Sequence, residues 1–177
     1  MKITELEIKG AYLIELEEFK DERGTFSRQF CKNELKKFGI DFDIKQCNIS
    51  KNYKKGTIRG MHYQKEPYPE IKMVSCLKGS IYDVIVDIRR DSETYLKWIS
   101  TKLTEDNNKM LYIPSGCAHG FQTLKDNSTL YYQLGEFFMP DYYSGVRYND
   151  PAFNIEWKDL GKPIMNDRDK NYPDWVR

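Results

Sequence analysis

Residues 72–88 read KMVSCLKGSIYDVIVDI and contain two short runs rich in apolar side chains. Lys78-Gly79-Ser80 separates the runs and is typical of a tight turn, so residues 72–77 and 81–88 are predicted to form a β-hairpin. Alternate side chains of a strand share a face. The even-numbered residues from Tyr82 to Ile88 therefore fall on one face, and the odd-numbered residues from Ile81 to Asp87 fall on the other.

Outside this hairpin the chain contains more short segments of the same character. Aromatic residues make up 14% of the composition, and glycine and polar turns separate the apolar segments. Short strands at this spacing are typical of a β-sandwich or a jelly-roll barrel rather than of a parallel α/β sheet. Further strands are expected at 95–103, 110–113, 120–124 and 129–134.

Helical structure is expected to be sparse. Asn33 suits the N-cap position of a short surface helix at 34–38, and Gly39 suits its end. The segment 157–177, rich in Pro, Asp and Lys, is expected to be irregular or briefly helical. The predicted fold class is mainly β, a jelly-roll β-barrel or sandwich with a few short helices.

Length and charge balance limit what the protein can be. A chain of 177 residues suits one domain, so a single domain is expected over 1–177. Charged residues form 31% of the chain but sum to a net charge of +1, which leaves no uniform field for nucleic acid or an anionic membrane. Acidic residues interrupt the N-terminal segment, and there is no apolar run of spanning length. We expect a cytoplasmic protein that binds neither nucleic acid nor membrane.

The cysteines have no spacing that would bind zinc or favour disulfide exchange, and they are expected to be reduced and buried. Only Cys117, two residues before His119, is a candidate nucleophile. A packing role is favoured for it, because cysteine reactivity requires a lowered pKa. The four cysteines are Cys31, Cys47, Cys76 and Cys117.

The two histidines lie in short glycine-containing segments, RGMHYQ at 59–64 and PSGCAHGF at 114–121. Imidazole has an unperturbed pKa of about 6.5 and can exchange protons near neutral pH. In an extended strand His62 and Gln64 share a face, and Lys72 shares a face with the other even-numbered residues of its own strand. If both faces line one barrel mouth, a base and a cation converge there. Removal of a proton beside a ketone requires such a pair.

Less specific roles remain open for these residues. An isolated histidine is more often structural than catalytic, and Lys72 is equally well interpreted as a solvated lysine on an edge strand. Arg23 and Arg59 could bind phosphates through bidentate hydrogen bonds or form surface salt bridges. Residues 51–55 are predicted to be a solvated lysine-rich loop. A metal site is not favoured, since the histidines form no His-x-His pair and the scattered cysteines are weak additional ligands.

A set of motifs extends over almost the whole chain. They are Asp21–Phe26 (DERGTF), Gln46–Ser50 (QCNIS), Gly56–Gln64 (GTIRGMHYQ), Lys72–Val74, Asp83–Arg89, Pro114–Phe121, Tyr131-Tyr132 and Asn149–Pro151. Together they resemble the nucleotide-sugar 4-dehydrohexose 3,5-epimerases, the dTDP-4-dehydrorhamnose 3,5-epimerase family. The resemblance implies a cupin-type jelly roll, a homodimer whose subunits exchange strands, and no metal or organic cofactor.

By this resemblance four residues correspond to the catalytic groups of the family. His62 resembles the base that removes the proton beside the 4-keto group, and Asp169 resembles the carboxylate that orients it. Tyr132 resembles the phenol that returns a proton from the opposite face of the sugar, and Lys72 resembles the cation that stabilises the enolate. Without the resemblance Tyr132 would suit the core and Asp169 the surface. The positions that correspond to substrate contacts are Arg23, Phe26, Arg28, Gln46, Asn48, Arg59, His119, Phe138, Tyr143 and Arg168.

Three positions depart from the family pattern where the nucleotide is bound. Arg28 and Tyr143 stand where acids are usual, and Phe138 replaces a base-stacking tyrosine. Carboxylates accept hydrogen bonds whereas Arg only donates, so a different base edge is expected to be recognised. Glu70 replaces a common glutamine and adds a charge near Lys72. The expected substrate is a dTDP-4-keto-6-deoxyhexose or a GDP-linked 4-keto hexose or heptose.

The predicted function is inversion at C3, C5 or both carbons of this nucleotide-linked sugar through an enolate, in the biosynthesis of surface-polysaccharide sugars. One alternative is a cupin ketoisomerase, which would move the carbonyl group. Another is a non-catalytic subunit that binds sugar nucleotides.

Overall fold

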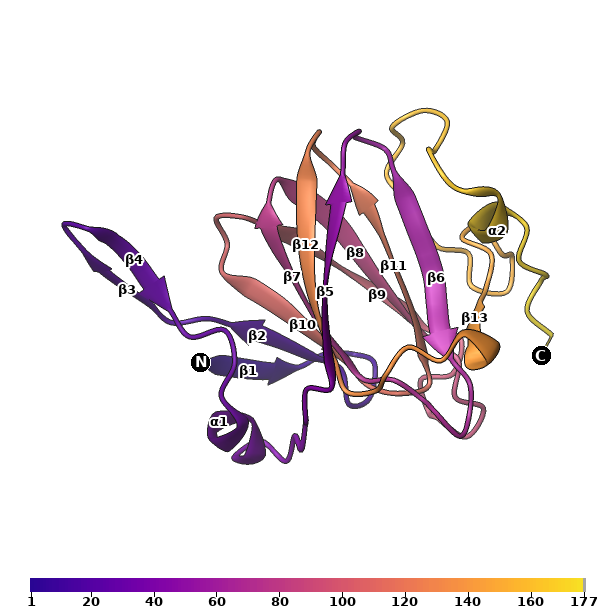
Figure 1. Cartoon of the computed structure of the whole chain (residues 1–177). Helices are drawn as coiled ribbons and strands as arrows, with labels where there is room; N and C mark the ends of the chain where they lie inside the picture. The colour runs from indigo at the N-terminus through magenta and orange to yellow at the C-terminus, as the bar shows by residue number, and fades with distance from the viewer. Residues whose placement is uncertain (177) are drawn as a thin grey trace.

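Two antiparallel sheets face each other in the computed structural model, which describes residues 1–176 (Figure 1). The six-stranded sheet contains, in spatial order, β1 (Lys2–Glu5), β2 (Tyr12–Glu15), β10 (Lys109–Ile113), β7 (Lys72–Lys78), β12 (Ser128–Leu134) and β5 (Gln46–Asn52). The five-stranded sheet contains β13 (Tyr143–Gly145), β6 (Ile58–Gln64), β11 (Cys117–Thr123), β8 (Ser80–Asp87) and β9 (Trp98–Thr104). This arrangement confirms the predicted jelly roll.

A third, two-stranded sheet projects from the body of the molecule. It consists of β3 (Glu18–Asp21) and β4 (Gly24–Ser27), and Figure 1 shows it extending away from both large sheets. Phe19 and Phe26 face each other across this hairpin with 58% and 68% of their surfaces exposed. We call residues 18–27 the arm. Its two aromatic side chains remain mostly exposed in the single chain.

The predicted hairpin between residues 72–77 and 81–88 is wrong, although both strands exist. β7 pairs with β10 and β12, whereas β8 pairs with β9 and β11, so the chain passes from one sheet to the other at this point. Gly79 makes the passage with a φ of +81°, and a Cβ atom there would lie 2.9 Å from Cα of Ser128. Glycine is required because other residues would be strained in this conformation and would collide with β12.

The alternation predicted for β8 is confirmed, and both of its faces are buried. Ile81 and Ile85 pack between the two large sheets, with Val74 and Leu130 from the opposite sheet. The even-numbered residues of β8 pack on the outer face of the five-stranded sheet, where the C-terminal part of the chain covers them. An N-terminal apolar cluster covers the outer face of the six-stranded sheet in the same way. The strands expected at 95–103, 110–113, 120–124 and 129–134 correspond to β9 to β12.

The first helix, α1 (Lys32–Lys36), starts earlier than predicted. Its N-cap is Cys31, which makes no side-chain capping hydrogen bond, so the prediction that Asn33 caps the helix is wrong. Burial of Leu35 and the contacts of Glu34 with Arg28 and the N-terminal amine hold this turn in place. The C-terminal segment contains one short helix, α2 (Asp167–Lys170), after a 3-10 turn, η1 (Pro140–Tyr142), earlier in the chain.

Two other local predictions need correction. Lys51 and Asn52 belong to β5 and not to a loop. All four cysteines are free, but Cys47 is exposed and Cys31 is half-buried. Cys117 is buried, and burial raises its pKa to about 12, which makes it a poor nucleophile and agrees with a packing role.

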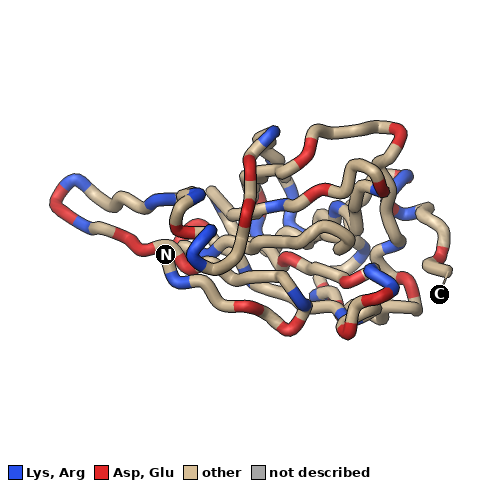
Figure 2. Tube along the Cα trace, turned by 90° about the horizontal axis from the view of Figure 1, so that it is seen from below, with Lys and Arg blue, Asp and Glu red and all other residues tan. Residues whose placement is uncertain are grey.

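The charges are mixed over the molecule. Figure 2 shows Lys and Arg interspersed with Asp and Glu along the whole trace, with no region of a single sign. Within residues 1–176 no helix is both long enough and apolar enough to cross a membrane.

Candidate active site

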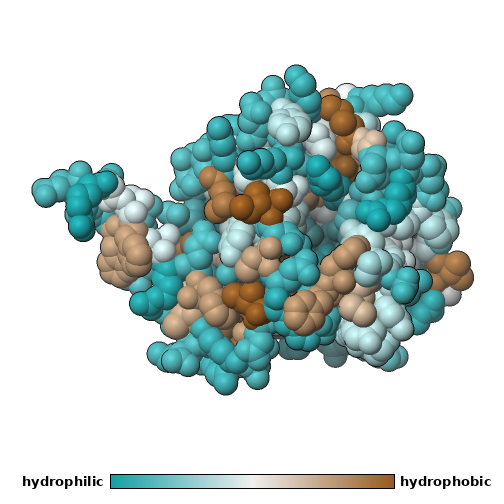
Figure 3. All heavy atoms as spheres, viewed as in Figure 1, coloured by the Kyte–Doolittle hydropathy of each residue, from teal (hydrophilic) through white to brown (hydrophobic). Residues whose placement is uncertain are grey.

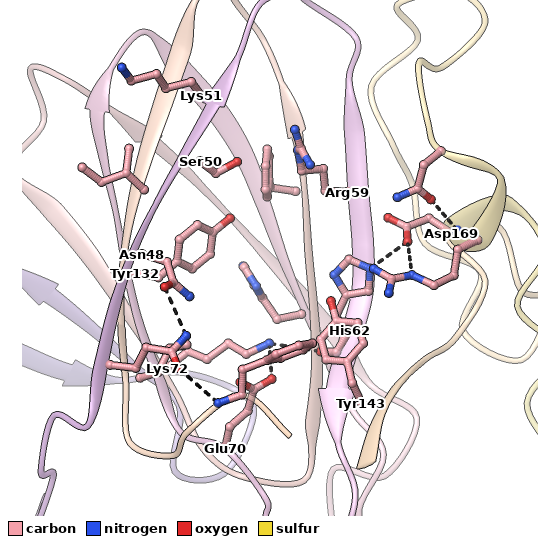
Figure 4. A pocket seen from close by; sticks show the side chains of 18 residues that line it. Asn48, Ser50, Lys51, Arg59, His62, Glu70, Lys72, Tyr132, Tyr143 and Asp169 are labelled. Carbon is pink, nitrogen blue, oxygen red and sulfur yellow. Dashed lines mark hydrogen bonds and ion pairs between the residues drawn. The ribbon is translucent and has the colours of Figure 1, made fainter. Parts of the chain in front are cut away.

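A cavity of about 470 Å³ opens between the two large sheets. Figure 3 shows the surface around it as mainly hydrophilic, with scattered apolar groups. Side chains from β5, β7 and β12 reach it from the six-stranded sheet, and side chains from β6 and β11 reach it from the five-stranded sheet. α2 closes one side (Figure 4). The sheets place groups that are far apart in sequence around one space.

His62 on β6 is paired with Asp169 on α2. Its Nε2 lies 2.9 Å from Asp169 Oδ1, and the Gly60 amide donates to Asp169 Oδ2 at 3.0 Å. An ionised carboxylate can only accept hydrogen bonds, so Nε2 of a neutral His62 carries the proton. Nδ1 then has a free lone pair, and it faces the cavity (Figure 4). The pair therefore presents an unprotonated ring nitrogen to any ligand in the cavity.

The surroundings keep this pair in that protonation state. Burial lowers the pKa of His62, and the hydrogen bond with Asp169 offsets this only in part. Burial by itself would raise the pKa of Asp169, but its hydrogen bonds with His62 and Gly60 hold the pKa below its ordinary value. Near neutral pH the imidazole is therefore neutral and the carboxylate is charged.

Two aromatic rings fix the position of the imidazole. The ring of Tyr143 lies 5.2 Å from that of His62, and the ring of Tyr172 lies 6.2 Å from it on an edge. Tyr172 fits only because residue 145 is glycine, since a Cβ atom there would overlap the Tyr172 ring and approach the Met61 carbonyl to 2.6 Å. The C-terminal segment thus supplies both the carboxylate and part of the packing around His62.

Lys72 on β7 lies at the floor of the cavity with 7% of its surface exposed, so its interpretation as a solvated edge lysine is wrong. Its Nζ is 2.7 Å from Glu70 Oε1 and donates to the His62 carbonyl oxygen at 3.3 Å. The prediction that Glu70 adds a charge near Lys72 is confirmed. An ammonium and a carboxylate therefore share the wall next to the base.

Tyr132 on β12 lies across the cavity from His62 (Figure 4). Burial and the nearby Asp83 carboxylate raise the pKa of Tyr132 well above its ordinary value, so its phenol remains protonated. The ring of His119 meets that of Tyr132 edge-on at 6.2 Å. The cavity thus has a neutral imidazole on one wall and a protonated phenol on the other.

His119 has its own carboxylate partner, Asp83, which the sequence predictions did not identify as a site residue. His119 Nε2 lies 3.0 Å from both oxygens of Asp83, and Asp83 is completely buried. Burial raises the pKa of Asp83, against the lowering effect of His119. The sequence did contain a signal for Asp83, because it shares a strand face with Ile81 and Ile85. An acid on an inward apolar face needs a partner.

The predicted substrate contacts separate into two groups. Seven line the cavity: Gln46, Asn48, Arg59, His119, Phe138, Tyr143 and Arg168. Within one chain the structure does not bring the other three to it. Arg23 lies on the arm and pairs with Asp21 at 2.5 Å, Phe26 lies on the same arm, and Arg28 pairs with Glu34 at 2.6 Å.

Two of the predicted residues, Arg59 and Arg168, make further contacts on the cavity wall. Arg59 Nε donates to the Asn52 side chain at 2.8 Å, which orients the guanidinium on this wall. The Arg168 guanidinium lies 4.9 Å from the centre of the Tyr143 ring. In the described part of the chain no three His, Cys, Asp or Glu side chains gather as a metal site would require. The unpredicted lining residues include Ser50, Lys51 and Asn166.

The fold and this cavity define a cupin-like protein whose site can remove and return protons. A family model described as dTDP-4-dehydrorhamnose 3,5-epimerase matches residues 5–176. The chain therefore belongs to the dTDP-4-dehydrorhamnose 3,5-epimerase family, and it is a sugar epimerase. The predicted family is confirmed.

Individual relatives agree with this assignment. The Shigella flexneri dTDP-4-dehydrorhamnose 3,5-epimerase is 37% identical over 172 residues, which cover 97% of this chain and 94% of the relative. The crystal structure of the Bacillus anthracis enzyme, with TDP and pyrophosphate bound, has a TM-score of 0.95 and 38% identity, and covers 98% of this chain and 99% of that one. A 3′-monoepimerase from Streptomyces bikiniensis in complex with dTDP-quinovose has a TM-score of 0.89 and 32% identity, covering 96% and 85%.

Proposed function

We propose that the protein inverts C3, C5 or both carbons of a nucleotide-linked 4-keto sugar, with His62 as the base. The observation that carries the proposal is the His62–Asp169 pair, whose free ring nitrogen faces the same cavity as Lys72 and Tyr132. The comparisons support the sugar class, because the relatives are named for 4-keto sugar substrates.

In the first step Nδ1 of His62 takes the proton from the carbon next to the ketone. The C–H electron pair becomes the C=C bond of an enolate, and the C=O pair moves onto the C4 oxygen. Lys72 stabilises this oxygen because its buried ammonium is held at the cavity floor, where charge interactions are stronger than in water. Asp169 stabilises the imidazolium that forms.

In the second step Tyr132 donates its phenolic proton to the same carbon. β12 and β6 belong to different sheets, so Tyr132 and His62 approach the sugar from opposite walls. A proton removed from one face and returned to the other inverts the configuration. Solvent then returns a proton to Tyr132 and removes one from His62, which completes the cycle.

For the nucleotide, we propose that Arg59 and Lys51 bind the diphosphate and that Phe138 stacks on the base. The two cations and the exposed ring of Phe138 all line the cavity. The names of the relatives favour a dTDP-linked sugar. Tyr143, which stands in place of an acid, keeps a GDP-linked sugar as the second candidate, because a neutral phenol and a carboxylate recognise different base edges.

We also propose a homodimer in which the arm completes the cavity of a second copy. The exposed Phe19 and Phe26 support this, because exposed aromatic side chains on a projecting hairpin are suited to an interface. Exchange of the arms would bring Arg23 and Phe26 to a cavity that they do not reach in their own chain. We further propose that the chain is one domain and works in the cytoplasm, where its free cysteines would stay reduced.

A mixing experiment tests the exchange. His62→Ala and Arg23→Ala are expected to be weakly active as separate homodimers. If the arms are exchanged, a mixed dimer contains one site with both native residues, and refolding an equal mixture restores about a quarter of the wild-type sites. No gain on mixing would show that each arm serves its own chain, or that no dimer forms, and light scattering separates these two outcomes.

Proton NMR in deuterium oxide tests the reaction. dTDP- and GDP-linked 4-keto sugars are incubated with the enzyme, and the C3 and C5 signals are followed. Loss of either signal with wild type but not with His62→Ala supports the proposal, and the faster nucleotide identifies the base. A ketone at a new carbon would indicate a ketoisomerase, and binding without exchange would indicate a binding subunit.

A further inference from the structure

We propose that Glu70 determines specificity by accepting a hydrogen bond from a sugar hydroxyl that borders the C4 oxygen. The inference rests on the proposed function, because Lys72 places the C4 oxygen. It adds a requirement on the sugar itself, namely a hydroxyl donor among the substituents of C3 and C5, the two carbons that flank the ketone. The C3 hydroxyl and a C6 hydroxyl are the two possible donors.

The first observation is the position of Glu70. It lines the cavity, and only 7% of its side chain is exposed. A carboxylate this far from water needs hydrogen-bond donors, because burial of an unsatisfied charged group is costly. Figure 4 shows Glu70 and Lys72 together at the floor of the cavity, below Tyr132 and His62.

The second observation is that the described residues do not satisfy this carboxylate. Oε1 of Glu70 is buried and accepts no hydrogen bond from residues 1–176. Lys72 Nζ is 2.7 Å from this oxygen, and this ion pair neutralises the charge. The ammonium donates to the His62 carbonyl oxygen. Oε1 is therefore enclosed beside Lys72, whereas Oε2 is neither enclosed nor hydrogen-bonded to a described residue, and it is the oxygen of this cavity-lining side chain that can accept from a sugar.

The third step is electrostatic. A carboxylate beside Lys72 weakens the field that stabilises an enolate, so for the chemistry alone Glu70 is unfavourable. The charge is compensated if it binds a group of the substrate. With Lys72 at the C4 oxygen, the groups within reach are the substituents of C3 and C5. A methyl group at C6 cannot donate a hydrogen bond, whereas a hydroxyl at C3 or C6 can.

Binding of unreactive ligands tests the inference independently of turnover. dTDP-glucose, dTDP-3-deoxyglucose and dTDP-6-deoxyglucose lack the ketone, so calorimetry measures their affinities without reaction. Wild type is expected to bind dTDP-glucose about 10- to 100-fold more tightly than the analogue that lacks the contacted hydroxyl. The analogue with weakened binding identifies the hydroxyl, C3 or C6.

Glu70→Met keeps the length of the side chain but removes the acceptor. In this variant the preference for dTDP-glucose is expected to fall to about threefold or less. If all three ligands lose affinity equally, or if wild type binds all three within about twofold, Glu70 only positions Lys72 and the inference is wrong. If Glu70→Met does not fold, Glu70→Gln is measured with the same ligands and is expected to lower the preference by several-fold, since charge-assisted bonds are roughly twice as strong as neutral ones.

Glu136→Gln is the matched control. Glu136 also pairs with a lysine at 2.7 Å, through Lys45, but it does not line the cavity. Its ligand preference is expected to match wild type. Deuterium exchange with 4-keto sugars is measured in parallel. Absence of a ligand preference in wild type refutes the role of Glu70, whereas absence of exchange with wild type refutes the proposed function.

Discussion

Replacement of Asp169 by Asn should remove most of the activity by reversing the tautomer of His62. The carboxylate accepts two hydrogen bonds, from His62 Nε2 at 2.9 Å and from the Gly60 amide at 3.0 Å. An Asn amide has one acceptor and one donor end. If its oxygen stays with Gly60, its NH₂ group faces His62, Nε2 must accept, and the ring proton moves to Nδ1. The nitrogen that faces the cavity can then no longer take a proton.

The opposite orientation of the amide that Asp169→Asn introduces has a cost that can be estimated. With the amide oxygen toward His62, the NH₂ group faces the Gly60 N–H, and two buried donors are left unpaired at a position where Asp169 is 1% exposed. An unsatisfied buried donor costs about 1–3 kcal/mol, and a hydrogen bond to a charged group contributes about 1.5–3 kcal/mol that is lost with the carboxylate. With two donors unpaired these give about 3.5–9 kcal/mol, so the rate is expected to fall at least about 10²-fold, the lower end of the contribution of a general base.

The assay is the initial rate of deuterium uptake at C3 and C5 in deuterium oxide. Asp167→Asn is the matched control, because it removes the same charge from the same helix at a side chain that is 93% exposed. The control is expected to exchange at the wild-type rate. Exchange by Asp169→Asn within about fivefold of wild type would refute the assignment of the proton to Nε2 and of the base to Nδ1.

Three other predictions follow from the same contacts. Tyr132→Phe should retain deuterium exchange but lose inversion, which NMR of the product configuration measures; inversion at the wild-type rate would require another donor. Burial lowers the pKa of His62, and the proposed base acts in its unprotonated form. The rate of exchange, measured as kcat/KM, should therefore fall on the acid side with a midpoint below pH 6.5, the ordinary pKa of histidine. A midpoint above pH 6.5 would contradict this environment. Gly145→Ala should destabilise the protein by about 1–3 kcal/mol in thermal unfolding, because its Cβ overlaps the Tyr172 ring; an unchanged melting temperature would show that the C-terminal segment moves freely.

Periodicity predicted strands well but could not predict their partners. The alternation in β8 correctly assigned its side chains to two faces, because each face is buried by a different apolar layer. The same pattern gave a false hairpin with β7, since a short turn between strands does not show whether they pair or change sheets. Whether the chain turns back or changes sheets depends on the close approach of Gly79 to Ser128, and these two residues are far apart in sequence.

The strands of the arm were not predicted for a related reason. β3 and β4 are exposed along almost their whole length, so no buried face imposes an alternating pattern on them. Their residues were identified only as part of a motif, and that motif placed Arg23 and Phe26 in a site they do not reach within one chain. If a second copy supplies the missing surface, the information lies in an interface and not in the folding of a single chain.

In the site, alternation correctly directed His62 and Lys72 to one cavity because both lie on strands with an apolar opposite face. Asp169 is 107 residues from His62 and lies on a four-residue helix, so no local pattern could identify it as a partner. Only the family resemblance indicated its role. Asp83 carried a local signal, an acid between two inward apolar residues, but the signal does not name the residue it pairs with.

The two histidine–carboxylate pairs differ in the exposure of the histidine and in the pKa of the carboxyl group. His62 keeps 17% of its side chain exposed and has its free ring nitrogen in the cavity, while the hydrogen bonds of Asp169 hold the pKa of that carboxyl below its ordinary value. His119 keeps only 4% of its side chain exposed, and burial raises the pKa of its partner, Asp83. A charged carboxylate stabilises a new imidazolium better than a carboxyl whose charged form is disfavoured. The proposed proton removal is therefore better suited to His62–Asp169 than to His119–Asp83, and Asp83 is suited to holding His119 against Tyr132.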